Sequence, residues 1–129
     1  MDEGGKPYVV NIERAAMENC HYRTALWTGT YLQVTLMCIP AGESIGMEVH
    51  EETDQFLRIV DGCGTVFFGP CREAMQPVAR VDGQDAVCVP AGTWHDICNT
   101  GRRPLRLYSV YAPPHHPFGT VQHTARDPE

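Results

Sequence analysis

Three side chains that commonly ligate metals lie close together near the middle of the chain. Glu48 carries a carboxylate, His50 an imidazole and Gln55 an amide oxygen. Side chains two positions apart in a strand point to the same face, so a strand through Glu48 and His50 would direct both toward one point. An alternating apolar run begins at Gln55, which predicts that this residue meets the pair across a hairpin.

His95 is a fourth candidate, because it follows the turn-forming segment 90–92 and begins another strand-like run. Together the four donors form a mixed nitrogen and oxygen set without a thiolate, which suits divalent zinc, manganese, iron, nickel or cobalt. Gln55 either ligates the ion directly or hydrogen-bonds to a water or substrate on it. The pattern predicts one divalent metal ion held by Glu48, His50, Gln55 and His95. Glu48 is also the predicted catalytic residue, and positions stay open for a ligand.

The spacing of these residues resembles the first sequence motif of the cupin family. That motif reads G-x5-H-x-H-x3,4-E-x6-G, and its fixed positions align with Gly42, Glu48, His50, Gln55 and Gly62. Two positions depart from the pattern, because Glu48 replaces the first histidine and Gln55 replaces the glutamate. The resemblance therefore implies a metal site with an altered set of ligands.

The second cupin motif, G-x5-P-x-G-x2-H-x3-N, is matched at its last four fixed positions by Pro90, Gly92, His95 and Asn99. Gly83 lies one residue upstream of the position that the motif gives to its first glycine. The resemblance covers Thr35 to Ala112. More loosely, the whole chain is similar to small single-domain bacterial cupins, which are often labelled as relatives of mannose-6-phosphate isomerase.

This resemblance implies an all-β fold, the double-stranded β-helix or jelly-roll barrel of cupins, and a homodimer that binds a small-molecule ligand. Three functions stay open. The first is a metal-dependent, isomerase-like enzyme that acts on a small polar metabolite such as a sugar or sugar derivative. The second is an Fe(II)-dependent dioxygenase. The third is a non-catalytic module that binds or senses a small molecule.

The pattern of strands and turns indicates an all-β sandwich or barrel on its own. It predicts two strands within 24–39, further strands over 64–69, 85–90 and 105–112, and a polar hairpin or loop over 70–85. Residues 1–7 are expected to be a frayed tail, and 13–19 contain helix formers but are short for a helix. With 129 residues we expect one domain. Its expected parts are a core of about 30–112, an N-terminal extension 1–23 and a Pro- and His-rich segment 113–129.

Charge and hydropathy argue against two classes of partner. The net charge is -6, and the only basic cluster is Arg102-Arg103, so nucleic acid is not expected. No apolar run approaches the roughly 20 residues that span a bilayer, and the N-terminus does not resemble a signal peptide. We therefore expect a cytoplasmic protein with no membrane partner.

The six cysteines are expected to be thiols in a reducing compartment. Cys38, Cys88 and Cys98 lie in apolar runs and are expected in the core. Cys63 and Cys71 flank a predicted strand, which leaves a functional pair open.

Four further residues are candidates for a substrate pocket: Gln33, Thr35, Trp94 and Tyr111. The first two are polar residues in an otherwise apolar strand, and the two aromatic residues could equally belong to the core. The prolines around His115 and His116 predict an extended surface segment. That segment could also be a lid over the barrel mouth or a second metal site.

Overall fold

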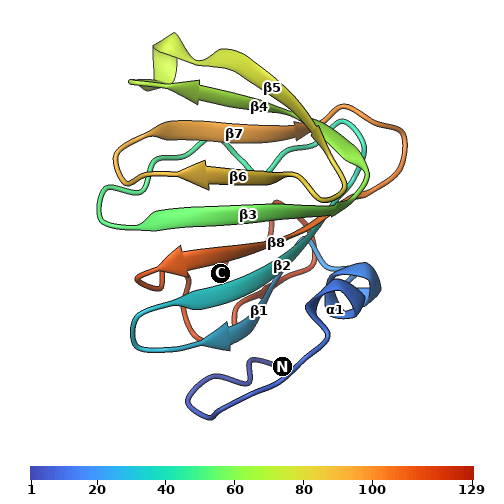
Figure 1. Ribbon diagram of the computed structural model, residues 1–129, viewed down its shortest axis with the longest axis vertical. Coiled ribbons are helices and arrows are strands. Elements are labelled where there is room, and N and C mark those ends of the chain that lie inside the picture. Colours follow the sequence, from blue (N-terminus) through green and yellow to red (C-terminus); the bar gives the residue numbers. More distant parts are fainter.

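Two antiparallel sheets face each other in the computed structural model, which describes residues 1–129 (Figure 1). The larger sheet has six strands in the order β6-β3-β8-β2-β1-β9, and the smaller has three in the order β5-β4-β7. This arrangement confirms the predicted all-β jelly roll. In chain order the elements are α1 (Ile12–Glu18), β1 (Arg23–Thr28), β2 (Gln33–Ile39), β3 (Asp54–Asp61), β4 (Cys63–Gly69), η1 (Arg72–Ala74), β5 (Gln76–Asp82), β6 (Ala86–Val89), β7 (Trp94–Asn99), β8 (Leu105–Ala112) and β9 (Val121–Gln122). None of the helices is long and apolar enough to cross a membrane.

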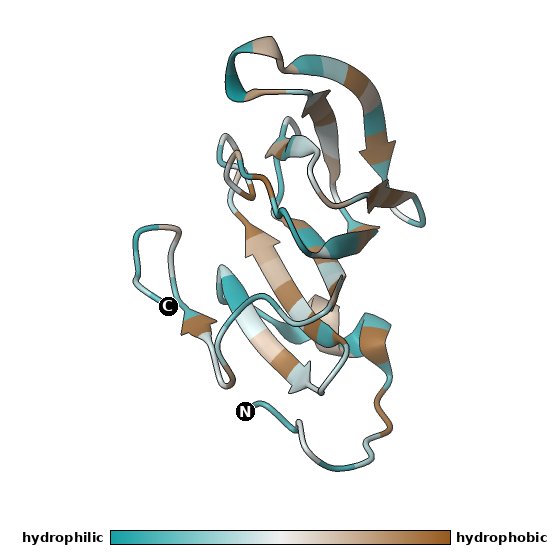
Figure 2. Ribbon diagram, turned by 90° about the vertical axis from the view of Figure 1, so that its left-hand side faces the viewer, coloured by the Kyte–Doolittle hydropathy of each residue, from teal (hydrophilic) through white to brown (hydrophobic).

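The inward-facing side chains change from polar to apolar along the barrel. At one end, on the left in Figure 1, they are polar or aromatic; at the other they are aliphatic. The polar end, here called the mouth, contains buried Gln33, Thr35, Gln55, Ser109 and Tyr111. The opposite end, here called the base, contains buried Met37, Ile39, Leu57, Ile59, Leu105 and Leu107. Figure 2 shows hydrophilic and hydrophobic residues as alternating bands along the strands. Buried polar groups need partners, so the mouth is where a ligand could be held.

The predicted hairpin between the Glu48 segment and β3 is wrong. Glu48 pairs instead with His95 of β7: its N–H donates to the His95 carbonyl at 3.1 Å, and the His95 N–H donates back at 3.0 Å. Gln55 pairs with Tyr111 of β8 in the larger sheet. The chain therefore passes from one sheet to the other between His50 and Gln55. The candidate ligands meet across the barrel rather than along one hairpin.

The N-terminal residues are not a frayed tail, because Asp2 is buried and fixes them to the barrel. Its carboxylate accepts hydrogen bonds from the N–H groups of Gly4 at 2.8 Å, Thr28 at 3.0 Å and Gly119 at 3.0 Å, and from the Thr28 hydroxyl at 2.6 Å. These bonds hold the N-terminus, the end of β1 and the C-terminal segment together. Helix α1 does form, and the Asn11 side chain caps it by accepting from the Arg14 N–H.

The six cysteines are free thiols. The prediction that Cys38, Cys88 and Cys98 belong to the core is wrong, since Cys88 is exposed and the other two are half-buried. Strand alternation explains this, because the inward positions on these strands are taken by their neighbours. Cys63 begins β4, whereas Cys71 lies beyond its other end, so the length of β4, roughly 20 Å, lies between the two.

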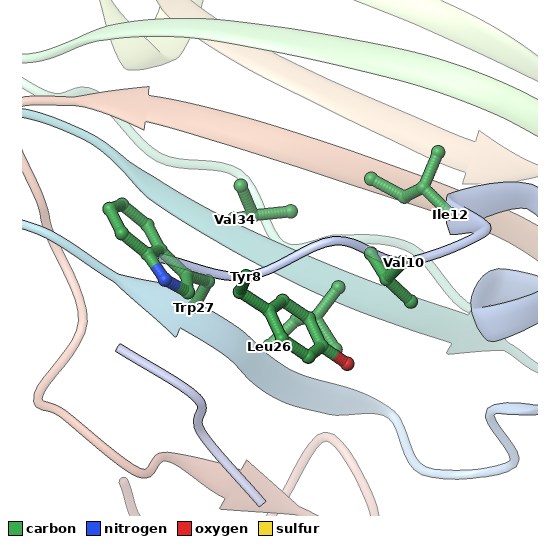
Figure 3. Close-up of a pocket in the computed structure, with 6 residues that line it drawn as sticks. All are labelled: Tyr8, Val10, Ile12, Leu26, Trp27 and Val34. Atoms are coloured by element: carbon green, nitrogen blue, oxygen red, sulfur yellow. The ribbon is translucent and has the colours of Figure 1, made fainter. Parts of the chain in front are cut away.

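An apolar pocket lies on the outer face of β1 and β2, away from the mouth (Figure 3). The segment from Tyr8 to Val10 crosses this face as an irregular chain. The pocket is lined only by hydrophobic residues: Tyr8, Val10, Ile12, Leu26, Trp27 and Val34. Its only side-chain polar groups are the phenol of Tyr8 and the indole N–H of Trp27.

Candidate metal centre

Three of the four predicted ligands come together at the barrel mouth. One donor atom from each of Glu48, His50 and His95 lies within 4.8 Å of the other two. Nε2 of His50 lies 3.4 Å from Oε1 of Glu48. Gln55 reaches the same point from the opposite sheet, with its Oε1 3.1 Å from Nε2 of His95. The arrangement therefore places two imidazoles, a carboxylate and an amide oxygen around one small volume.

Several polar atoms in this volume are buried without hydrogen-bond partners. They are Oε1 of Glu48 and both ring nitrogens of His50, because the 3.4 Å contact between these residues lacks hydrogen-bond alignment. Each unpartnered buried polar atom costs about 1–3 kcal/mol. A cation would satisfy the carboxylate oxygen and one imidazole nitrogen together. The donor set thus fits a divalent metal ion.

His95 is held in the tautomer that a metal ligand requires. Its Nδ1 lies 3.0 Å from the Thr93 carbonyl oxygen, so Nδ1 carries the proton and Nε2 presents a lone pair. Burial lowers the pKa of His95, although the Thr93 carbonyl and the Glu48 charge oppose the effect. Nε2 of a neutral His95 and Oε1 of Gln55 are both acceptors, and they lie 3.1 Å apart. A cation bound to both atoms would remove the repulsion between them.

Glu48 is ionised in this environment. Burial alone would raise its pKa, but the contact with His50 and the positive charge of Arg23 outweigh burial and hold the pKa below its usual range. A buried carboxylate that stays charged is costly without a cationic partner. The group is thus available as an anionic ligand at neutral pH.

A segment that we call the strap, residues 113–120, covers this site. The ring of His115 lies 4.1 Å from that of His50 and stacks on Tyr111 at 5.8 Å, measured between ring centroids. His116 is buried rather than on the surface, and its Nδ1 lies 2.8 Å from Oε1 of Glu129. The prediction of a surface segment is therefore wrong at His116. The strap lies over the site, which matches the alternative prediction of a lid.

The other candidate pocket residues occupy different places. Gln33 is fully buried, and its amide binds the strap through the main chain of His115 and His116. Thr35 faces the interior, with its hydroxyl buried and unpartnered. The ring of Trp94 stacks with Arg72, whose guanidinium carbon lies 5.2 Å from the ring centroid. Adjacent strand positions face opposite sides, so Trp94 points away from the interior that His95 faces.

Sequence reasoning missed one charged residue of the barrel interior, Arg23, which is buried at the start of β1 opposite Met37. A charged residue at a strand terminus normally suggests a solvent-facing position. The available signal was its spacing from Ala25, the next inward-facing residue of the same strand. Residues two apart in a strand share one face, but this rule could be applied to Arg23 only after the structure showed that β1 begins at residue 23.

Comparison with known proteins identifies the family. Residues 35–111 match the cupin domain family. The chain belongs to the cupin family. Among related sequences, this cupin is 54% identical over 126 residues to YrkC of Bacillus subtilis (strain 168), an alignment that covers 98% of the chain and 68% of YrkC.

Among solved structures, the crystal structure of BH2720 from Bacillus halodurans is 50% identical and superposes with a TM-score of 0.89 over 95% of this chain and 92% of BH2720. KdgF from Halomonas sp. is 18% identical and has a TM-score of 0.63 over 72% of this cupin and 78% of KdgF. At that identity the likeness to KdgF shows a shared fold only.

Proposed function

We propose that this cupin binds one divalent metal ion through Glu48, His50 and His95, with Gln55 as a fourth, oxygen donor. The observation that carries the proposal is the set of buried, unpartnered donor atoms on Glu48 and His50 beside the His95 lone pair. A merely structural polar cluster would satisfy its atoms with one another. Four protein donors on a six-coordinate ion leave positions for a ligand, which favours chemistry over structural closure.

The function that this site supports best is isomerase-like chemistry on a small polar metabolite. A bound divalent ion would act as a Lewis acid and polarise oxygen atoms of the ligand. Glu48 would hold negative charge beside the reacting group, and His95 would be kept in its Nε2-ligating form by the Thr93 carbonyl. His115 on the strap would shield the ligand from water. The strap over the mouth supports a small ligand rather than a polymer.

Metal analysis tests the proposal directly. Protein purified without added metal and without a His tag is expected to contain about one divalent ion per chain. Replacing both His50 and His95 by Ala should remove the ion and leave the far-ultraviolet circular dichroism of the barrel unchanged. His123→Ala is the matched control, because His123 is exposed and packs only against the edge of His21 at 4.4 Å.

Retained stoichiometric metal in the double variant, or equal loss in the His123 variant, would contradict this site. The identity of the ion then separates the functional classes. Iron lost in Glu48→Ala would favour an Fe(II)-dependent dioxygenase and direct the next assay to oxygen uptake. Zinc, manganese, nickel or cobalt would support the Lewis-acid proposal, whereas a metal-loaded protein that binds metabolites without turnover would be a sensing module.

A further inference from the structure

One buried charge inside the barrel takes no part in the proposed metal site. Arg23 is 5% exposed and is the only buried arginine of the chain. The ion pairs of the structure involve Arg58, Arg103, His50 and His116, so Arg23 has no carboxylate partner. Burying a guanidinium without a counter-ion is strongly unfavourable. Such a group calls for an anion that the polypeptide itself does not supply.

The hydrogen bonds of Arg23 leave one edge of its guanidinium free. Nη1 donates to Oε1 of Gln122 on β9. Nη2 has only the Met37 sulfur at 3.8 Å, which is a weak acceptor, and Nε has no partner although it is buried. Nε and Nη2 form the edge that binds a carboxylate side-on through two parallel hydrogen bonds. The interior therefore holds an unused bidentate donor pair.

Arg23 lies inside the barrel, deeper along the strands than the level of Gln33 and Gln55. It starts β1 opposite Met37 of β2, and its side chain turns into the barrel. Burial alone would raise the pKa of Glu48, and the charge of Arg23 is one of the effects that reverse this. Burial lowers the pKa of His116, and Arg23 lowers it further. The guanidinium thus acts on both the ligand set and the strap.

We propose that Arg23 is the anion-binding residue of this site and that the molecule bound there is a small carboxylate. The inference rests on the proposed function, because a divalent ion bound by Glu48, together with the charge of Arg23, would leave the barrel interior with two excess positive charges. A carboxylate would reduce that excess and fill the free guanidinium edge. The strap, with His115 packed on His50, restricts the ligand to a small one.

Calorimetric titration of the metal-loaded full chain tests this assignment. The probes are acetate, glycolate, lactate and malonate, with acetamide and lactamide as uncharged isosteres and inorganic phosphate as a competing oxyanion. We expect at least one carboxylate to bind and its amide to bind at least tenfold more weakly. Arg23→Gln should weaken carboxylate binding at least tenfold while metal content stays at the wild-type level. Arg58→Gln is the control, since Arg58 lies on the outer face in an ion pair with Glu13 at 2.8 Å.

Three results would overturn the proposal: equal binding of a carboxylate and its amide, unchanged carboxylate affinity in Arg23→Gln, or tighter Arg23-dependent binding of phosphate than of every carboxylate. If Arg23→Gln does not fold, the comparison of acid and amide in the wild-type protein decides alone. A wild-type protein without metal would refute the proposed function. A metal-loaded protein that binds none of the carboxylates would refute only the anion site.

Discussion

Replacing Gln33 by Leu should release the strap from the barrel mouth without unfolding the barrel. The Gln33 amide makes four hydrogen bonds. Its Nε2 donates to the Thr28 hydroxyl at 3.0 Å and to the His116 carbonyl at 2.8 Å, and its Oε1 accepts from the N–H groups of His115 at 3.2 Å and His116 at 2.9 Å. Leucine is similar in size but can form none of them.

The magnitude follows from the three main-chain groups that would lose their partner. Each costs about 1–3 kcal/mol if it stays buried, so a docked strap would lose about 3–9 kcal/mol. That is comparable with the whole stability of a domain, which is about 5–15 kcal/mol. Release of the strap into water avoids most of this cost, so local opening should win over global unfolding.

Amide hydrogen exchange measures the effect residue by residue. In Gln33→Leu the protection of the His115 and His116 amides should fall at least about 100-fold, which corresponds to about 3 kcal/mol. Amides in the middle of β8 should stay protected. Gln76→Leu on the exposed strand β5 is the matched control and should change neither set. Unchanged protection of His115 and His116 in folded Gln33→Leu would refute the anchoring role.

Three further changes test other parts of the fold. Asp2→Asn removes the charge from a carboxylate that accepts four hydrogen bonds, so the free energy of unfolding in urea should fall by about 1–3 kcal/mol, and an unchanged value would contradict the anchor. Burial lowers the pKa of His116 to about 4 from 6.5, so the unfolded chain takes up this proton first. Stability should therefore decline from about pH 6.5 to about pH 4 by at most about 3 kcal/mol, and His116→Gln should remove that part of the pH dependence. Gln84 has a positive φ of 78°, so Gln84→Gly should raise the thermal midpoint by relieving about 1 kcal/mol of strain, whereas Gln84→Ala should not.

Local sequence patterns determined much of the fold. Alternation and turn residues predicted the β1–β2 hairpin and the inward face of β3, on which Gln55, Leu57 and Ile59 are buried. Motif spacing singled out His50 and His95, which the structure brings together at the mouth. These features depend on residues close in sequence or on regular spacing, which is why a single sequence can reveal them.

Features that depend on distant pairings were not predictable. The partner of the Glu48 segment is β7, and nothing local to residue 48 distinguishes that pairing from a hairpin with β3. The strap docks through one glutamine far away in sequence, Gln33, so prolines around His115 suggested a surface segment. The first glycine of the second motif is another case. The motif places its first glycine at position 84, and Gly83 lies one residue before it. In this chain Gln84 itself adopts the left-handed conformation at that position.

The division of the barrel into an aliphatic base and a polar mouth explains how one small chain can carry costly buried charges. The base packs Leu57, Leu105 and Leu107 at full burial, and burial of each such side chain contributes about 1.5–3 kcal/mol. Inside the barrel, Arg23 is buried and Glu48 is half-buried, and their opposite charges form no ion pair, so neither satisfies the other. A fold selected only for stability would join these charges in an ion pair or replace them with apolar groups. Keeping them apart leaves Glu48 available to a cation and Arg23 available to an anion.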